Sequence, residues 1–192
     1  MAVTNVLIAG VGGQGTILAS ELLALAAIAA GNDVKQGEFH GVAQRGGAVF
    51  SHVRFGERVH SPMARQGAVD YFLAMEKLEA LRYAHFVKPG GTIIVNDHSV
   101  EPIRLADERP YPERAIEFLE SKSYDVVRME ATERAIELGN HRAANMVMLG
   151  RLAAYLELPA EVWDETLRGR IPERFLSLNQ QAFAAGRGAP GS

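Results

Sequence analysis

The residues best suited to chemistry in this sequence form a glycine-rich loop near the amino terminus. Residues 10–15 satisfy the pattern G-x-G-x-x-G, directly after a short apolar stretch and before a segment rich in Ala and Leu. In that context the backbone N–H groups at the start of a helix point toward an anion. We therefore predict that cofactor-binding or interface residues include Gly10, Gly12, Gly13, Gln14, Gly15 and Thr16.

Two common nucleotide-binding patterns fit this loop only in part. Thr16 and Ile17 stand where a P-loop needs Lys followed by Ser or Thr, which argues against a P-loop nucleoside triphosphatase. A site for NAD or FAD needs an acidic residue at the end of the second strand. Asp33 would begin that strand, and Glu38 is followed by Phe39. The loop therefore binds a dinucleotide, grips another phosphate or a partner's backbone, or forms only a tight strand–helix junction.

A second glycine-rich cluster spans residues 38–47, where four polar side chains stand among glycines. Arg45 can hold a carboxylate or phosphate with two hydrogen bonds, and Gln44 can donate or accept in the same site. The alternative is that Arg45 and Glu38 pair at a contact between chains. The predicted binding or interface residues of this cluster are His40, Gln44, Arg45, Gly46 and Gly47.

Other reactive side chains indicate no catalytic centre. His40, His52 and His60 lack the short spacing of a zinc motif, and Ser51 lies outside a G-x-S-x-G pattern. We predict no metal site and no catalytic residue in this chain. Arg142 and Asn145 lie one helical turn apart in an otherwise apolar segment, so they belong either to a site or interface, or to a polar surface.

The absence of cysteine excludes whole classes of function. The 192 residues contain no Cys, so the chain cannot supply the thiolates of an iron–sulfur cluster, a Cys-type zinc site or a disulfide framework. Redox chemistry would need a bound organic cofactor or a partner chain. A net charge of −3 offers no basic field for nucleic acid or an anionic membrane. With no secretory signal at the amino terminus, we expect a cytoplasmic protein.

Charge and glycine are unevenly distributed along the chain. Residues 1–56 carry only six of the 43 charged side chains but ten of the 19 glycines. Such a composition marks backbone that is buried or is closely approached by a ligand or by another chain.

Alternating apolar stretches and helical segments indicate the elements that must position these loops. We predict an α/β fold with an open, mainly parallel Rossmann-like sheet, a β-hairpin insertion and a helical C-terminal region. The hairpin would pair residues 49–55 with residues 58–60. One domain covers residues 1–186, and residues 187–192 form a disordered tail. Strands are expected at 6–9, 34–38, 49–55, 69–75, 92–95 and 124–129, and helices at 16–30, 78–86, 113–119, 132–138, 142–156, 160–169 and 173–185.

Large apolar side chains in the C-terminal part indicate its packing. Met146 and Met148 are expected in the core. Trp163, Phe175 and Phe183 are expected to hold the C-terminal helices together.

Taken together, the two glycine clusters resemble the gamma-type family of 2-oxoacid:ferredoxin oxidoreductase subunits, and within it the small subunits of the enzymes that act on indolepyruvate. Three motifs in order are more specific than G-x-G-x-x-G alone, and the likeness extends over residues 5–186. The residues that carry it lie at 9–15, 40–47 and 51–56, with further matches at 61–62, 79–82, 96, 139–140, 142, 145 and 179–183.

The resemblance implies a subunit of an enzyme that oxidatively decarboxylates aryl pyruvates such as indolepyruvate to aryl-acetyl-CoA, with ferredoxin as the electron acceptor. It places thiamine diphosphate and the iron–sulfur clusters on a large alpha subunit, on which this chain docks and helps to close a coenzyme A site. It also adds Asn96 to the binding or interface residues. The chain would bind no cofactor and show no activity alone. The alternative is a stand-alone Rossmann-like nucleotide-binding protein, which calorimetry with NAD, FAD and coenzyme A would reveal.

Overall fold

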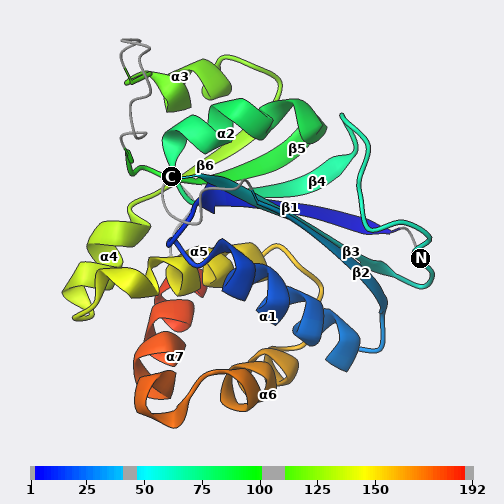
Figure 1. Ribbon diagram of the computed structural model, residues 1–192, viewed down its shortest axis with the longest axis vertical. Coiled ribbons are helices and arrows are strands. Elements are labelled where there is room, and N and C mark those ends of the chain that lie inside the picture. Colours follow the sequence, from blue (N-terminus) through cyan, green and yellow to red (C-terminus); the bar gives the residue numbers. More distant parts are fainter. Residues whose placement is uncertain (1–2, 41–46, 101–110, 189–192) are drawn as a thin grey trace.

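The computed structural model describes residues 3–40, 47–100 and 111–188, which form one six-stranded sheet between two layers of helices (Figure 1). In sheet order the strands are β2, β3, β1, β4, β5 and β6. Strand β3 pairs antiparallel with both β2 and β1, whereas the pairs β1–β4, β4–β5 and β5–β6 are parallel. The predicted mainly parallel α/β sheet is therefore confirmed. The strands span β1 Thr4–Val11, β2 Asp33–His40, β3 Ala48–Gly56, β4 Val69–Ala74, β5 Val87–Asn96 and β6 Asp125–Met129.

Helices cover both faces of the sheet. Figure 1 shows α2 and α3 on one face, α1, α5, α6 and α7 on the other, and α4 near the carboxyl ends of the parallel strands. The helices span α1 Thr16–Ala29, α2 Lys77–Tyr83, α3 Ala115–Glu120, α4 Ala131–Glu137, α5 Ala144–Ala153, α6 Ala160–Arg170 and α7 Glu173–Arg187, with short 3-10 helices η1 Ala84–Phe86 and η2 His141–Ala143.

The strand order creates a crevice between β1 and β4. After β1 the chain moves through α1 to β2 and β3 on one side, and then returns to form β4 on the other side of β1. In open α/β sheets, ligands bind outside the carboxyl ends of the strands at such a reversal. The glycine loop follows β1, so the fold places it at this point.

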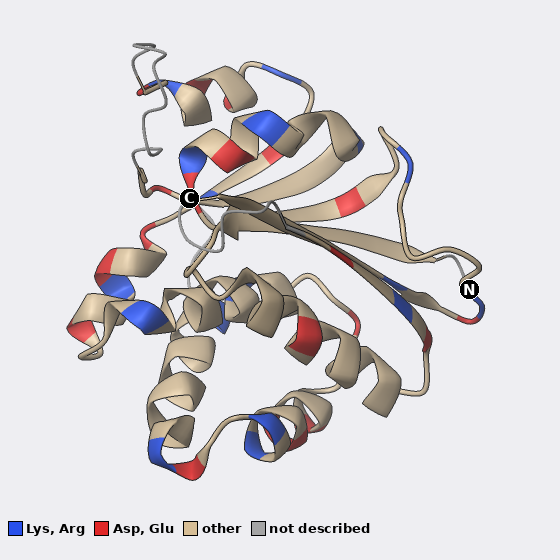
Figure 2. Ribbon diagram, viewed as in Figure 1, with Lys and Arg blue, Asp and Glu red and all other residues tan. Residues whose placement is uncertain are grey.

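Strand β1 explains much of the low charge at the start of the chain. Its residues alternate between two apolar cores, one on each face of the sheet. Val6 and Ile8 belong to the core that includes α1 and α5, and Leu7 and Ala9 belong to the core that includes α2. All four side chains are fully buried. By sequence β1 carries no charged residue and α1 carries one, Glu21, which agrees with the mostly uncharged ribbon of these two elements in Figure 2. A strand buried on both faces tolerates no unpaired charge, so the composition reflects burial within this chain.

The β-hairpin is present, but the prediction of its strands was wrong. Strand β3 pairs with β2 over its whole length, from Asp33 opposite Gly56 to His40 opposite Val49, and residues 57–60 form no strand. The side chain of Asp33 accepts a hydrogen bond from the Val59 backbone N–H at 2.7 Å. This bond directs the chain across the amino end of β2 and leaves β3 free to pair with both β1 and β2.

The C-terminal helices confirm most of the predicted packing. Met146 and Met148 are fully buried, and the Trp163 and Phe183 rings lie 5.2 Å apart. Phe175 was wrongly assigned to this cluster, because it lies in the first turn of α7 with 44% of its surface exposed, against the Arg174 guanidinium.

Helix α7 runs through Arg187, one residue past the predicted domain boundary, while residues 189–192 lie outside the described part of the chain. Among the described residues, no helix is both long and apolar enough to cross a bilayer.

Candidate functional site

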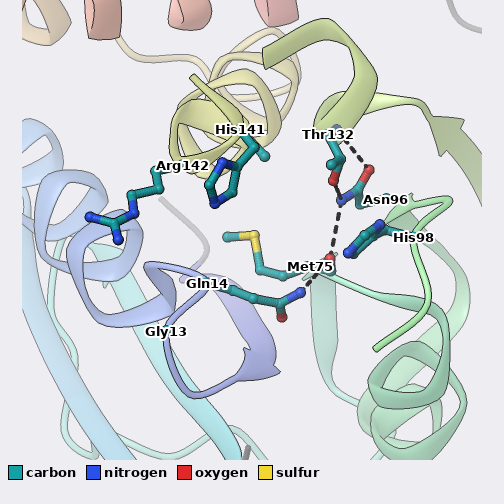
Figure 3. A pocket seen from close by; sticks show the side chains of 9 residues that line it. Gly13, Gln14, Met75, Asn96, His98, Thr132, His141 and Arg142 are labelled. Atoms are coloured by element: carbon teal, nitrogen blue, oxygen red, sulfur yellow. Dashed lines mark hydrogen bonds between the residues drawn. The ribbon is translucent and has the colours of Figure 1, made fainter. Parts of the chain in front are cut away.

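A cavity of about 280 Å³ opens at the carboxyl ends of β1, β4 and β5 (Figure 3). Its floor comes from the glycine loop through Gly13 and Gln14, and from Met75, which directly follows β4. Asn96 and His98 line it from the end of β5. The other side comes from the start of α4, from η2 and from the first residue of α5.

The glycine loop leaves the N-terminus of α1 without a side-chain cap. Gly15 is the N-cap residue, and no acidic residue stands in the first turn. Gly13 and Gly15 have φ angles of 106° and 77°, which favour glycine over any residue with a Cβ atom. The partial positive charge of α1 therefore has no counter-charge from its own first turn and is directed to the edge of the sheet where the cavity lies.

Thr16, the first residue of α1, is also polar and buried. Its hydroxyl has no hydrogen-bond partner within the described residues, and 3% of its surface is exposed. The sequence singled out this residue, and the structure places it at the helix end where an anion would bind.

Two predicted site residues, Gln14 and Asn96, form hydrogen bonds to backbone groups of the protein itself. The Gln14 side chain accepts a hydrogen bond from the Val11 backbone N–H at 2.7 Å and donates one to the Met75 carbonyl at 3.4 Å. Asn96 donates to the same Met75 carbonyl at 3.2 Å (Figure 3). These bonds link the ends of β1, β4 and β5 and shape the loop, so both side chains support the cavity from beneath.

Three basic residues line the cavity and are here called the basic wall: His98, His141 and Arg142. Figure 3 shows His98 and His141 extending toward the cavity from different sides. None of the three side chains has a hydrogen bond or ion pair to the described residues. No Asp or Glu stands among the described residues that line the cavity. The cavity therefore offers donors without acidic side chains, an arrangement that favours an anionic ligand.

Asn145 connects the basic wall to the glycine loop. It is 4% exposed, and its side-chain amide donates to the Gly15 carbonyl at 3.4 Å. A Cβ atom at Gly15 would lie 2.3 Å from the Asn145 amide nitrogen, so only glycine allows this approach. Arg142 is exposed and lines the cavity, and Asn145 is buried beneath it, so the structure brings both residues close to the glycine loop.

The second glycine cluster meets the first. The Gly12 backbone N–H donates to the Gly47 carbonyl at 2.9 Å, although the two residues lie far apart in sequence. His40 is the last residue of β2, at the same edge of the sheet. The calls on Gln44, Arg45 and Gly46 lie outside the described residues.

The strand order disfavours the dinucleotide alternative. A Rossmann site places the acidic residue on the strand next to β1, but here β3 lies between β1 and β2. Glu38 accepts a hydrogen bond from Gln36 at 2.9 Å and is exposed, and Asp33 lies at the opposite end of β2. Neither carboxylate is positioned to bind a ribose beside the glycine loop.

Buried carboxyl groups fix the start of α2 beside the cavity. Glu76 is fully buried, and its side chain accepts hydrogen bonds from the Glu79 N–H at 2.5 Å, the Leu78 N–H at 3.0 Å and the Tyr111 hydroxyl at 2.5 Å. Burial and the Glu76 carboxylate together raise the pKa of Tyr111, which keeps its proton in this bond. Burial likewise raises the pKa of Glu79. This network holds the segment that follows Met75.

Sequence reasoning missed His98 and His141. Each lies next to a residue that it did select, since His141 precedes Arg142 and His98 follows Asn96 by two positions. The linear spacing of the histidines carried no signal, because 43 positions of sequence separate two side chains that the sheet edge brings to one cavity.

Fold and site together define the class of this protein. It is a Rossmann-like α/β domain without cysteine, and its cavity at the strand reversal favours an anionic ligand. The chain belongs to the pyruvate ferredoxin/flavodoxin oxidoreductase family, whose sequence pattern matches residues 5–189. The family resemblance seen in the motifs is thereby confirmed.

Curated relatives share nearly the full length of the chain. It is 36% identical over 190 residues to indolepyruvate oxidoreductase subunit IorB of Pyrococcus horikoshii, covering 95% of this chain and 93% of the relative. It is 33% identical over 184 residues to 2-oxoglutarate synthase subunit KorC of Methanothermobacter marburgensis, covering 94% and 92%. Both relatives are subunits of 2-oxoacid oxidoreductases.

Solved structures share the fold. The gamma subunit of a keto/oxoacid ferredoxin oxidoreductase from Geobacter sulfurreducens has a TM-score of 0.73 at 27% identity, and the match covers 95% of each chain. A 2-oxoglutarate:ferredoxin oxidoreductase from Magnetococcus marinus, solved with 2-oxoglutarate, coenzyme A and succinyl-CoA bound, has a TM-score of 0.75 at 21% identity. That match covers 97% of this chain and 31% of the other, and it shows the fold alone.

Proposed function

We propose that this chain is the small subunit of an indolepyruvate:ferredoxin oxidoreductase. The observation that carries the proposal is the 36% identity, over 95% of the chain, to a subunit named for an indolepyruvate oxidoreductase. The complex would convert an aryl pyruvate, coenzyme A and two oxidised ferredoxins into the aryl-acetyl-CoA, carbon dioxide, a proton and two reduced ferredoxins. Its proposed partners are a large alpha subunit and ferredoxin, and its proposed compartment is the cytoplasm.

The amino-acid composition of this chain limits which steps of the reaction it can perform. Iron–sulfur clusters need thiolate ligands, and the sequence has no Cys, so these residues do not fit a cluster. No electron-transfer step is assigned to this chain. We place thiamine diphosphate and the clusters on the large subunit, where the carbon–carbon bond of the oxoacid would break and the electrons would leave.

The cavity gives this chain its own part, which is to hold the anionic portion of coenzyme A. Coenzyme A carries a diphosphate and a phosphate monoester, which need several donors within a small volume. The uncapped N-terminus of α1 and the guanidinium of Arg142 both supply donors to anions. His98 and His141 add ring nitrogens that lack partners among the described residues. Coenzyme A bound in this way would leave its thiol free to extend into the large subunit.

The first test replaces Arg142 by alanine in the complex with the large subunit. We expect the KM for coenzyme A to rise about tenfold, while kcat changes less than about twofold, because a contact to a phosphate far from the reacting thiol contributes to binding alone. Steady-state dye reduction with indolepyruvate at varied coenzyme A measures both constants.

Arg134→Ala is the matched control for this test. Arg134 lies on neighbouring α4, where it is exposed and pairs with Glu137 at 2.7 Å outside the cavity. A KM that stays unchanged in Arg142→Ala, or rises equally in Arg134→Ala, would remove coenzyme A from this cavity. Turnover of 2-oxoglutarate or pyruvate in preference to indolepyruvate would overturn the assigned substrate.

A further inference from the structure

The side chain of Asn96 is fully used by hydrogen bonds within the protein. Asn96 ends β5 and is 2% exposed. Its amide group donates to the Met75 carbonyl at 3.2 Å and to the Thr132 hydroxyl at 2.9 Å. Its oxygen accepts from the Ala131 N–H at 3.0 Å and the Thr132 N–H at 3.4 Å. A side-chain amide has two donor hydrogens and two acceptor positions, so none is left for a ligand.

Two of these bonds make Asn96 the cap of α4. The residue at the N-cap position of α4 is Glu130, whose side chain makes no capping hydrogen bond. The first N–H groups of a helix have no partner inside the helix. Asn96 supplies the acceptor from a different element, 35 positions earlier in the sequence. The start of α4 is therefore fixed to the end of β5.

Helix α4 connects this cap to the basic wall. It spans only Ala131–Glu137 and is followed by Gly139, whose φ of 100° turns the chain back. The Asn140 side chain then accepts from the Arg142 N–H at 3.0 Å and so caps η2, which carries His141 and Arg142. Because a two-turn helix is stiff, a shift at its start moves both side chains.

We propose that Asn96 is a positioning residue of the coenzyme A cavity. It holds α4 from β5 and thereby sets the position of His141 and Arg142 over the glycine loop, without contacting the ligand. Asn145, through Gly15, holds the far end of the same segment. This inference rests on the proposed function and adds to it a residue that acts through the wall.

The test compares Asn96→Ala with Asn5→Ala in the complex with the large subunit. Asn5 is the matched control, because its side chain also makes several bonds, to Ala68, Asp70 and Arg54, but at the opposite edge of the sheet. We expect Asn96→Ala to raise the KM for coenzyme A about tenfold or more with kcat within about twofold, since small misplacements of binding groups weaken binding strongly. Asn5→Ala should leave both constants within about twofold of the wild type.

Hydrogen exchange of the isolated chain supplies a readout that does not depend on coenzyme A. We expect faster amide exchange over residues 131–144 in Asn96→Ala and not in Asn5→Ala. Asn96→Asp keeps the two acceptor positions, so it should restore the protection at the start of α4. Unchanged exchange over residues 131–144 in Asn96→Ala would overturn the inference, even if the variant is less stable.

The outcomes separate this inference from the proposed function. If Arg142→Ala raises the KM for coenzyme A and Asn96→Ala does not, the positioning role is wrong and the proposed function stands. If Arg142→Ala leaves that KM unchanged, coenzyme A does not bind here and the role of Asn96 toward it is overturned as well. The exchange experiment then reports only whether Asn96 holds α4.

Discussion

Replacing Gly186 by alanine is expected to destabilise the fold by about 4 kcal/mol or more, which is most of the stability of an ordinary domain. Helices α5 and α7 cross with their backbones in contact at this point. A Cβ atom at Gly186 would lie 1.8 Å from the Val147 carbonyl oxygen, which belongs to the backbone and cannot move aside alone. Urea denaturation followed by circular dichroism measures the loss, as a lower midpoint or as failure to fold.

Two further glycines make this prediction specific. Gly150 is the reciprocal position on α5, where a Cβ atom would lie 2.0 Å from the Phe183 carbonyl oxygen, so Gly150→Ala should be similarly damaging. Gly169 lies in α6 with no atom within 4 Å of an added Cβ, so Gly169→Ala should be neutral or stabilise by about 0.5–1 kcal/mol. A Gly186→Ala protein as stable as Gly169→Ala would contradict the close crossing.

Lowering the pH from about 7 to about 4.5 is expected to remove about 2 kcal/mol of stability through His52 alone. His52 is fully buried in β3 beside the rings of Phe39, Phe50 and Phe86. Burial, and to a smaller extent the charge of Arg54, lowers the pKa of His52 from 6.5 to about 4. Between these values the unfolded chain binds a proton that the folded chain does not, so stability is complete above about pH 6.5 and falls as the pH decreases.

The variant His52→Leu should lose this part of the pH dependence. Leucine fills a similar volume among the aromatic rings. It also removes the two ring nitrogens of His52, neither of which has a hydrogen-bond partner among the described residues. Chemical denaturation at about pH 7 and about pH 4.5 gives the free energy of unfolding for both proteins, with exposed His60→Leu as the control. Equal losses of stability on acidification in the wild type and His52→Leu would show that His52 does not carry the effect.

Local sequence was sufficient for the loop that begins the site and for most elements, although not for the strand expected at residues 58–60, which the structure lacks. Residues 10–15 predicted a turn between strand and helix, and two of the loop glycines have the positive φ angles that favour this residue. Met146 and Met148 were correctly assigned to the core, since apolar spacing on a helix reports burial directly. By contrast, Phe175 is as apolar as Phe183 but lies in the first turn of α7 with 44% of its surface exposed.

Strand pairing and long-range contacts could not be predicted from the local sequence. Residues 49–55 pair with β2, and the chain after them is held by a hydrogen bond from the Val59 N–H to the Asp33 carboxylate, which the alternation of side chains does not encode. Gln14 and Asn96 were predicted as cofactor-binding or interface residues, and the structure adds that both side chains bond to the carbonyl of Met75. That carbonyl belongs to the backbone, so its role as an acceptor cannot be predicted from the type of residue at position 75.

The sequence by itself determined the α/β class, the glycine loop at its first strand–helix junction and the exclusion of thiolate chemistry, because these follow from local backbone preference and from composition. Only the tertiary structure decided that β3 lies between β1 and β2, and that His98, His141 and Arg142 line one cavity. These residues lie close together because parallel strands bring distant chain segments to one edge of a sheet. The physical reason is that local interactions set each element, whereas strand order and helix crossing set which elements touch.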